Sequence, residues 1–440
     1  MSETSLNILE RIRTGYGKDI DLTLRPAYRD LLAALGNPQN KLPPVLHVAG
    51  TNGKGSTCAF MRAMLEAAGY RVHVYTSPHL VTFHERIRIA GRLIEEKQLV
   101  EILHEIENLS TPGSISYFEA TTAAALVAFT RTQADFTILE VGLGGRLDAT
   151  NIVDRPLATL ITRLSYDHRD YLGDSIDGIA REKAGIMRAG VPCFAAAQPD
   201  ASALQALRDA ADKIGAPLSV AGQDWKIAEQ KDGFRFADAA RVFELPPPAL
   251  LGAHQYQNAG LAIAALSVLK NPLPAPAIAE GLRNVEWLAR LQRLTGGALN
   301  ALLPPDTELW LDGGHNDSAG EVLAAQIARW RDQDGENPKP LYVILGMLTS
   351  KVPKEFLAPL AKSIAGLCAI PVEDPLSFDP AVLADQARAL GISEVTDAQD
   401  VQRALGAVPS GSYRILMAGS LYLAGTALAA QAHSAPSANR

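Results

Sequence analysis

A glycine-rich turn in the first part of the chain carries the residue types that bind phosphate. The turn Gly50–Ser56 joins an apolar run to a helix-forming stretch. Glycines let several backbone N–H groups point at one anion, and a helix N-terminus adds partial positive charge. Lys54 can reach the β and γ phosphates of a nucleotide, and the Ser56 hydroxyl can ligate Mg²⁺. The turn predicts a nucleotide-phosphate site, with a tight structural turn as the alternative. The residues of this predicted site are Gly50, Thr51, Asn52, Gly53, Lys54, Gly55 and Ser56.

Three polar side chains follow apolar runs elsewhere in the chain and could complete this site. Glu140 closes the run Phe136–Leu139, where an unpaired buried carboxylate would be costly, so an ion or a base is a suitable partner. Ser77 and His168 each follow another apolar run after a few residues. Because the carboxyl ends of parallel strands form one ligand-binding edge, we expect these groups to meet beside the phosphate turn. The alternatives are a salt-bridged core carboxylate at Glu140 and an ordinary loop histidine at His168.

A second glycine-rich stretch, Gly142–Asn151, comes directly after Glu140 and Val141. So many glycines indicate that another group approaches the backbone closely, or that the backbone adopts unusual dihedral angles. On its residues alone, the stretch predicts a ligand-binding loop but names no ligand.

The elements that must position these residues alternate between strand and helix patterns. Val45–Ala49, Ser56–Ala68 and Arg71–Tyr75 read as strand, helix and strand, which is a βαβ unit with two parallel strands. From Trp225 to Glu244 the period shortens toward two, which predicts a small β-ribbon. The other expected strands of this part are Phe136–Val141, Ala158–Thr162 and Val191–Ala196, and the other helices are Phe118–Arg131, Ser175–Ala189 and Gly252–Leu269.

The same alternation resumes later in the chain, with strand patterns at Glu308–Leu311, Leu341–Gly346, Gly366–Ile370 and Tyr413–Met417. We therefore expect an α/β protein of two domains, at residues 1–294 and 295–440. The first would be a phosphate-loop ATPase domain with a mainly parallel sheet and the β-ribbon. The second would be a Rossmann-like α/β domain with its own core.

Composition restricts the classes of protein to consider. The chain has 440 residues, a net charge of −7 and interspersed acidic and basic residues, which argues against nucleic-acid binding. No apolar run reaches the ~18 residues of a membrane span, and Met1–Gly15 lacks the apolar region of a secretory signal. The three cysteines follow no pairing or metal-ligand pattern, as is typical of a reducing compartment. We therefore expect a cytoplasmic protein that does not contact membranes, and nothing in the composition requires more than a monomer.

Taken together, these segments resemble the folylpolyglutamate synthase/dihydrofolate synthase family of the Mur ligase superfamily. No single motif would be specific, but their number and order along most of the chain make the match strong. The segments that carry the resemblance are Asn37–Pro43, Gly50–Ser56, Ser77–Leu80, Glu140–Asn151, Asp167-His168, Arg181–Ile186, His254-Gln255 with Asn258, Arg290–Gln292 and Asp312–Asn316.

The resemblance implies an ATP-dependent ligase that activates a carboxylate as an acyl phosphate and joins it to L-glutamate. Lys54 and the amides of the turn would hold the ATP phosphates. Asn258, Arg290, Asp312 and His315 match positions that contact ATP or close the two domains over it. The carboxylate substrate would be dihydropteroate or a folate that already carries glutamate, and the motifs leave open which of these activities the chain has.

The resemblance also implies two Mg²⁺ ions. Ser56, Ser77 and Glu140 would bind one ion, and His168 the second. Lys183 matches a lysine that the family carries as a carbamate, which supplies the anionic oxygen that an amine lacks. A helix lysine paired with a nearby acid is the alternative.

Three residues match family positions near the pterin ring: Phe118, Asp148 and Ala149. Phe118 could equally be a core residue. In this reading Lys54, His168, Lys183 and Arg290 are the catalytic residues.

Some positions depart from the family pattern. The family usually has Pro-Gly before the arginine, where this chain has Leu288-Ala289, so the loop that carries Arg290 could follow another path.

Two other functions compete with this reading. A Mur-type ligase for peptidoglycan precursors would have a Gly-Lys-Thr turn and an additional N-terminal domain, for which too few residues precede Val45. A phosphate-loop ATPase that acts as a binding module would need neither the second domain nor the second glycine-rich stretch.

Overall fold

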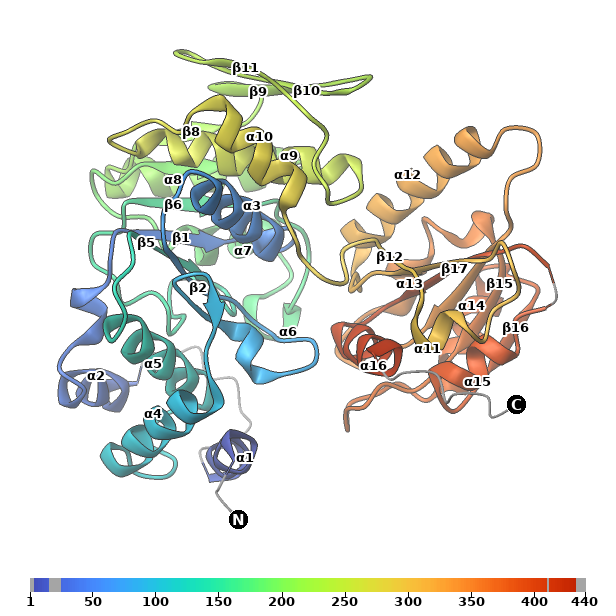
Figure 1. Cartoon of the computed structure of the whole chain (residues 1–440), viewed down its shortest axis with the longest axis horizontal. Coiled ribbons are helices and arrows are strands. Elements are labelled where there is room, and N and C mark those ends of the chain that lie inside the picture. The colour runs from blue at the N-terminus through green and yellow to red at the C-terminus, as the bar shows by residue number, and fades with distance from the viewer. Residues whose placement is uncertain (1–3, 16–24, 410, 433–440) are drawn as a thin grey trace. The chain divides into compact units, whose positions relative to one another are not determined.

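Two large sheets and one sheet of three strands organise the chain in the computed structural model, which describes residues 4–15, 25–409 and 411–432. The first compact unit consists of Met1–Ala249 and Gln255–Glu286, and the second of Leu250–His254 and Trp287–Arg440. Both units are α/β, as expected (Figure 1).

The sheet of the first unit has eight strands in the order β4-β3-β2-β5-β1-β6-β7-β8. Six neighbouring strands run parallel to one another, in the order β2, β5, β1, β6, β7 and β8. Strands β3 and β4 are antiparallel additions at one edge. Every residue of β1 is buried, because helices cover both faces of the sheet. The strands are β1 (Val45–Ala49), β2 (Val72–Tyr75), β3 (Ile87–Ile89), β4 (Arg92–Leu93), β5 (Phe136–Glu140), β6 (Ala158–Ile161), β7 (Cys193–Ala195) and β8 (Leu218–Val220).

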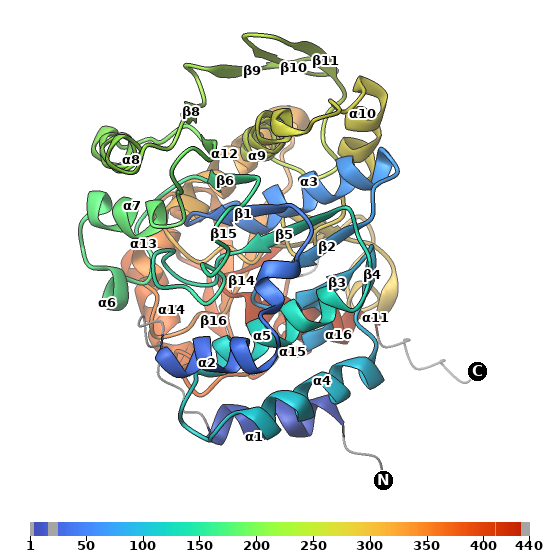
Figure 2. The same ribbon diagram turned by 90° about the vertical axis from the view of Figure 1, so that its left-hand side faces the viewer.

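Helices α3 and α10 lie on one face of this sheet, and α4 and α5 lie on the other (Figures 1 and 2). Helix α10 packs closely on α3, since a Cβ at Gly281 would lie 2.6 Å from the backbone of Met64. The helices of the first unit are α1 (Ser5–Gly15), α2 (Pro26–Ala34), α3 (Lys54–Ala67), α4 (Glu96–Leu109), α5 (Tyr117–Thr130), α6 (Arg169–Leu172), α7 (Ile176–Ala184), α8 (Ala201–Ile214), most of α9 (Ala253–Ala265) and α10 (Ala275–Asn284).

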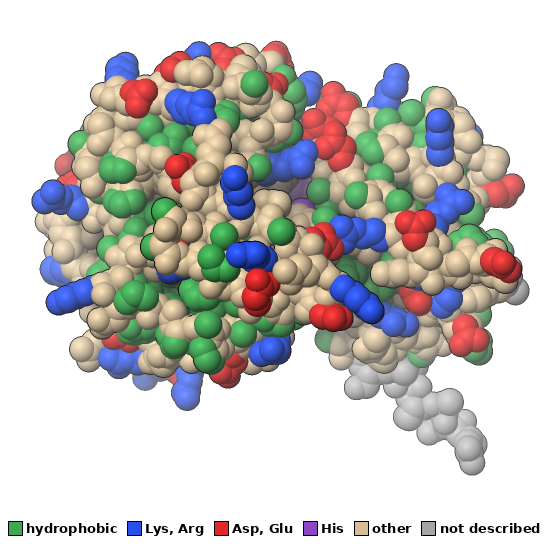
Figure 3. Space-filling view, turned by 90° about the horizontal axis from the view of Figure 1, so that it is seen from above, with side chains coloured by type: hydrophobic (Ala, Val, Ile, Leu, Met, Phe, Trp, Pro, Cys, Tyr) green, Lys and Arg blue, Asp and Glu red, His purple; other side chains and the backbone are tan. Residues whose placement is uncertain are grey.

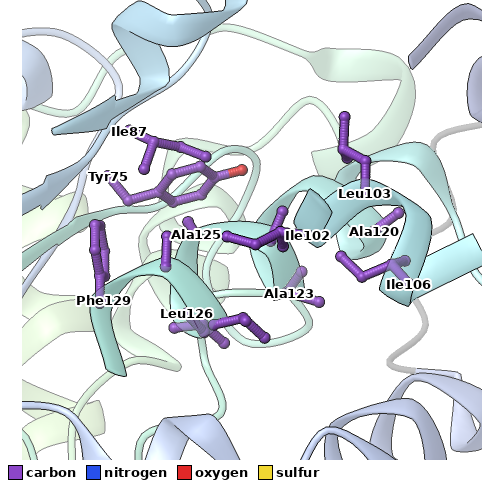
Figure 4. Close-up of a cluster of buried hydrophobic side chains, with 14 of the residues drawn as sticks. Tyr75, Ile87, Ile102, Leu103, Ile106, Ala120, Ala123, Ala125, Leu126 and Phe129 are labelled. Carbon is purple, nitrogen blue, oxygen red and sulfur yellow. The ribbon is translucent and has the colours of Figure 1, made fainter. Parts of the chain in front are cut away.

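The core beneath β2 and β3 is built by α4 and α5 (Figure 4). Tyr75 and Ile87 face apolar side chains of both helices, among them Ile102 and Leu126. Helix α5 begins at a capping box, in which the Ser116 hydroxyl accepts from the Glu119 N–H and the Glu119 carboxylate accepts from the Ser116 N–H. This cap fixes where the helix starts, and so places Phe118 in its first turn.

The expected β-ribbon is an antiparallel sheet of three strands, β9 (Trp225–Gln230), β10 (Gly233–Asp238) and β11 (Val242–Leu245). It lies beside α9 and α10 (Figure 1). Phe234 and Phe236 of β10 are fully buried, so one face of the ribbon contributes to the core of the unit.

The second unit has a six-stranded sheet in the order β12-β13-β17-β14-β15-β16, parallel except for β12. Leu294 ends β12 and pairs with Leu309 of β13, so the boundary expected at residue 294 falls inside the second unit. The elements are β12 (Gln292–Leu294), α11 (Gly297–Asn300), β13 (Glu308–Leu311), α12 (Asp317–Asp334), β14 (Leu341–Leu345), α13 (Pro353–Leu357), β15 (Ile364–Ala369), α14 (Pro380–Ala389), β16 (Val395–Asp397), α15 (Val401–Gly406), β17 (Arg414–Ala418) and α16 (Leu421–Ala432).

Two general expectations can be set against the structure. None of the helices in the described ranges combines the length and apolar character needed to cross a bilayer. On the face shown in Figure 3, Lys and Arg side chains are interspersed with Asp and Glu rather than gathered into a band.

The long helix expected at Ser175–Ala189 is wrong at its end, because α7 stops at Ala184, before Gly185.

Candidate functional site

The phosphate turn connects β1 to α3 with backbone angles that favour glycine. Gly50 has φ +144° and Gly53 has φ +90°, and Gly53 is the N-cap of α3. At each of these glycines, a polar atom of a neighbouring side chain occupies the space that a Cβ would take. A Cβ at Gly50 would lie 1.8 Å from Thr162 Oγ1, and a Cβ at Gly53 would lie 2.4 Å from Asn258 Oδ1. The glycines therefore let polar side chains come close to the turn.

Two lysines converge on this turn. Lys54 Nζ donates to Gly50 O at 3.1 Å and to Thr51 O at 3.2 Å, while Lys183 Nζ donates to Gly50 O at 3.0 Å. Burial and then the charge of Lys54 lower the pKa of Lys183 to about 7, against the opposing influence of Asp167 and Asp148. The two amines repel each other when both are charged, and an anion bound here would relieve that repulsion.

Several polar atoms around the turn are buried and lack a hydrogen-bond partner among the described residues. They include hydroxyls on α3, on the loop after β6, and an amide nitrogen on α9. Buried polar groups are nearly always paired, so such a gathering indicates a place where a ligand supplies the missing partners. The atoms are Ser56 Oγ, Thr57 Oγ1, Thr162 Oγ1 and Gln255 Nε2.

Glu140 and Ser77 meet at the same edge of the sheet. Strands β1, β2 and β5 are adjacent and in register, with Val48 opposite Glu140 and Tyr75 opposite Leu139. The Ser77 N–H donates to Glu140 Oε2 at 3.2 Å. Burial and then the charge of Glu140 raise the pKa of the buried Cys58 thiol, whereas the charge of Lys54 lowers it.

The donor atoms at this edge fit a hard divalent cation. Serine hydroxyls and one carboxylate are oxygen ligands, which Mg²⁺ prefers, and Ser56 Oγ is a buried hydroxyl without a partner. In the described part of the chain, no group of three or more His, Cys, Asp or Glu side chains could hold a metal ion. An ion here would therefore take its other ligands from phosphate and water, as Mg²⁺ with a nucleotide usually does.

The loop that leads to His168 is attached to the phosphate turn. The N–H groups of Thr51 and Asn52 both donate to Arg163 O at 3.1 Å, and Thr51 Oγ1 donates to Ser165 O at 3.1 Å. His168 has φ +52° and its Nε2 lies 3.9 Å from Asp167 Oδ2. That His168 meets Lys54 and Glu140 around bound metal remains a prediction.

The second glycine-rich stretch, residues 142–151, docks on the end of α7. Arg146 N donates to Glu182 O at 2.8 Å, and Asn151 Nδ2 donates to Gly185 O at 3.0 Å. A Cβ at Gly145 would lie 2.8 Å from Glu182 O and 3.0 Å from the Lys183 Cα. This close packing explains the glycine at that position and places Lys183 on the phosphate turn.

The three residues expected near a pterin ring occupy one region. Phe118 lies against the same stretch, since a Cβ at Gly142 would lie 2.3 Å from its ring. Ala149 is buried, and its carbonyl accepts from Tyr28 OH at 3.1 Å. Asp148 is also buried, and its carboxylate already accepts hydrogen bonds from the Leu143 N–H and from Thr150.

In the second unit, Arg290, Asp312 and His315 come together around Gly313. A Cβ at Gly313 would lie 2.9 Å from an Arg290 guanidinium nitrogen. Asp312 Oδ1 accepts from Gly314 N and Oδ2 from Leu291 N, each at 2.7 Å. His315 Nδ1 donates to Gly313 O at 2.9 Å, which leaves Nε2 as the ring's acceptor.

The backbone around Arg290 is strained. Ala289 has φ +54° and Leu291 has φ +46°, both in the left-handed region that glycine favours. Ala289 thus keeps a conformation suited to the glycine that the family pattern has at this position.

The sequence placed Asn258 in the ATP site but assigned no role to its partner Gln255, although Gln255 belongs to the same segment of the family resemblance. Asn258 Nδ2 donates to Gln255 Oε1 at 3.0 Å, one helical turn earlier on α9. The three-residue spacing of two amides on an otherwise apolar helix was the available signal. The sequence also assigned no role to Asp167, whose charge raises the pKa of Lys183 more than that of Asp148 does.

Comparison with known proteins identifies the family. The Mur ligase middle domain model matches residues 48–266. The dihydrofolate synthase/folylpolyglutamate synthase of Bacillus subtilis is 37% identical over 313 residues, which cover 67% of this chain and 70% of that protein. The chain belongs to the dihydrofolate synthase/folylpolyglutamate synthase family.

Solved structures of this family agree over nearly the whole chain. Escherichia coli FolC in complex with DHPP and ADP has a TM-score of 0.86 and 31% identity, covering 97% of each chain. The Yersinia pestis folylpolyglutamate synthase/dihydrofolate synthase complexed with AMPPNP and a Mn ion has a TM-score of 0.84 and 30% identity, covering 98% of each chain. The chain is therefore an ATP-dependent ligase, and neither a separate peptidoglycan-precursor ligase nor a non-catalytic ATPase module fits it as well.

Proposed function

We propose that this ligase joins L-glutamate to dihydropteroate, to folates that already carry glutamate, or to both. The observation that best supports nucleotide activation is the meeting of Lys54 and Lys183 at Gly50 O, beside buried polar atoms without partners. The family membership supports the choice of glutamate and a pteroate-type acid as substrates.

In the proposed reaction, a carboxylate oxygen of the pteroate-type substrate attacks the γ-phosphorus of ATP, and ADP leaves. Lys54 and the N–H groups of Gly50–Ser56 stabilise the negative charge on the transferring group. The product is an acyl phosphate. The amine of L-glutamate then attacks the acyl carbon, loses a proton and expels phosphate, which leaves an amide.

The protein residues proposed to hold divalent metal are those with oxygen or imidazole donors at the sheet edge. Ser56, Ser77 and Glu140 would hold one Mg²⁺, and His168 with a carbamate on Lys183 a second. Bound there, Mg²⁺ supplies electrostatic stabilisation of phosphate oxygens. The pKa of Lys183 near 7 supports the carbamate, since only a neutral amine adds carbon dioxide.

The carbamate has its own test. Lys183→Ala is expected to be inactive and to regain part of its activity when short carboxylates are added. Full activity of Lys183→Ala would rule out the role, and Lys183→Arg serves as the control that keeps charge but forms no carbamate.

The acyl phosphate must be kept from water, so the site has to close during the reaction. We propose that Arg290, Asp312 and His315 of the second unit complete the ATP site together with Asn258 of the first. An Arg290→Ala variant that kept full ligase activity would remove the basis for this closure.

Phe118, Asp148 and Ala149 are proposed to form the region that receives the pterin ring. The protein is proposed to act as a cytoplasmic monomer on small-molecule substrates only.

The deciding experiment is a coupled assay of ADP release. ADP should form only when ATP, L-glutamate and a pteroate-type acid are all present. The assay is run first with dihydropteroate and then with a reduced folate, which separates the two activities. ADP release that is equal with and without the acid would contradict the proposal.

A further inference from the structure

A buried chain of hydrogen bonds connects the strand before the phosphate turn to the second glycine-rich stretch. His47 in the middle of β1 has its Nε2 2.9 Å from Thr150 Oγ1. Thr150 Oγ1 donates to Asp148 Oδ1 at 2.5 Å, and Thr150 N donates to the same oxygen at 2.9 Å. Asp148 Oδ2 accepts from Leu143 N at 2.9 Å, which closes the stretch on itself.

The direction of each hydrogen bond follows from chemistry. With Asp148 ionised, its carboxylate can only accept, so the Thr150 hydroxyl proton points at it. The Thr150 oxygen must then accept from His47, which fixes the hydrogen of the imidazole on Nε2. His47 is buried, and burial and then Arg188 lower its pKa to about 3, so the ring is neutral near pH 7.

The carboxylate of Asp148 is occupied within the loop. One of its oxygens accepts two hydrogen bonds from Thr150, and the other accepts from the Leu143 N–H. Burial raises the pKa of Asp148. Backbone hydrogen bonds from Leu143, Thr150 and Gly142 lower it and so oppose that rise. Asp148 therefore acts first on the shape of its own loop.

We infer that His47 and Thr150 are positioning residues, which hold Asp148 and the loop of residues 142–151 in the conformation that receives the carboxylate substrate. The inference rests on the proposed function, because it takes the loop beside Phe118 to be the substrate surface. The loop is attached to β1 through His47, to α2 through Tyr28, and to the end of α7 through Arg146 and Asn151.

The hydroxyl of Thr150 offers a matched pair of substitutions. Thr150→Val keeps the shape but removes the hydroxyl, so His47 and Asp148 each lose a partner inside the core. Thr150→Ser keeps the hydroxyl and loses only a methyl group. If Thr150→Val does not fold, His47→Met and His47→Gln form the second pair, since the glutamine amide can donate where the His47 Nε2–H does.

The first measurement uses hydrogen exchange and needs no activity. In the ligand-free protein, the amides of Leu143 and Thr150 are expected to be protected in the wild type and in Thr150→Ser. In Thr150→Val they should exchange at least about tenfold faster, because one buried hydrogen bond to a charged group is lost. Equal protection in all three proteins would overturn the inference.

The second measurement is steady-state kinetics with each substrate varied in turn. Thr150→Val is expected to raise KM for the pteroate-type acid by about tenfold or more, with KM for ATP changed by less than about twofold, and Thr150→Ser should restore the wild-type value. A loss of kcat with both KM values unchanged would instead mean that Thr150 only supports the fold, and would overturn the inference. If the wild-type protein had no ligase activity, the proposed function would be wrong. The hydrogen-exchange result would still show whether the hydrogen bonds of His47, Thr150 and Asp148 hold the loop.

Discussion

The two glycine-rich segments of the first unit look alike in sequence but differ in how their polar atoms are satisfied. Around the phosphate turn, Ser56 Oγ, Thr162 Oγ1 and Gln255 Nε2 are buried without partners among the described residues. In the loop of residues 142–151, Asp148, Thr150 and Asn151 are all hydrogen-bonded to the protein itself. Glycine content thus marks close packing in both segments, whereas the gathering of unpaired buried polar atoms distinguishes the phosphate turn from the loop of residues 142–151.

The largest expected effect tests the phosphate turn. Lys54→Met should lower the rate of ADP release by about 10²–10³-fold, because it removes a preorganised positive charge from the transferring phosphate. Thermal unfolding should change little, since the Lys54 ammonium bonds only to carbonyls of the turn. Lys97→Met, at a side chain that is 89% exposed, is the matched control and should keep full activity.

The second prediction tests the loop through its packing. Gly145→Ala should destabilise the first unit by about 1–3 kcal/mol, because the new Cβ meets the backbone of Glu182 and Lys183. Urea unfolding measures the change. Gly406→Ala on α15 is the control, since a Cβ there meets no atom within 4 Å. An unchanged midpoint for Gly145→Ala would mean that the loop does not dock on α7 as described.

This contrast explains what could be predicted from the sequence. The turn was identified because Lys54 follows glycines between a buried strand and a helix, and each of those signals is local. The edge that joins Ser77 to Glu140 was also predictable, because the parallel order of β2, β5 and β1 follows from the alternation of strands and helices.

Other features depend on contacts between distant segments, which no local pattern encodes. The partner of Thr150 is His47, on a strand about a hundred residues earlier, and an inward histidine in an apolar strand resembles any core residue. The edge strands β3, β4 and β12 are too short for their period to be recognised. The boundary between the domains was expected at residue 294, whereas the main segment of the second unit begins at Trp287. The strand β12 lies between these positions and is recognised only through its pairing with β13.

The third prediction concerns pH and the strand beneath the loop. The pKa of His47 is about 3 in the folded protein and near 6.5 when unfolded, so between these values the unfolded state binds one proton more. Stability conferred by neutral His47 is therefore lost as pH falls from about 6.5 to about 3. His47→Gln should reduce the slope of unfolding free energy against pH in this window by up to about 1.4 kcal/mol per pH unit.

The smallest expected effect distinguishes backbone docking from surface charge. Arg146 forms an ion pair with Glu182 at 2.9 Å, but its side chain is 56% exposed. Arg146→Ala should therefore change the unfolding free energy by only about 0–1 kcal/mol, like Arg388→Ala at a comparable exposed pair. A larger loss for Arg146→Ala would show that the ion pair, rather than the glycine contact, holds the loop on α7.

The left-handed residues on both sides of Arg290 have a practical consequence for engineering the enzyme. An alanine with φ +54° is held in a conformation that disfavours it by about 1–2 kcal/mol, and glycine removes that penalty. Ala289→Gly is therefore the single change that we would introduce first to obtain a more heat-resistant enzyme, with a gain of roughly 2–4 °C in the Tm of the second unit measured by calorimetry. Because the change leaves the Arg290 side chain itself intact, resistance to heat and turnover could be selected independently at this loop.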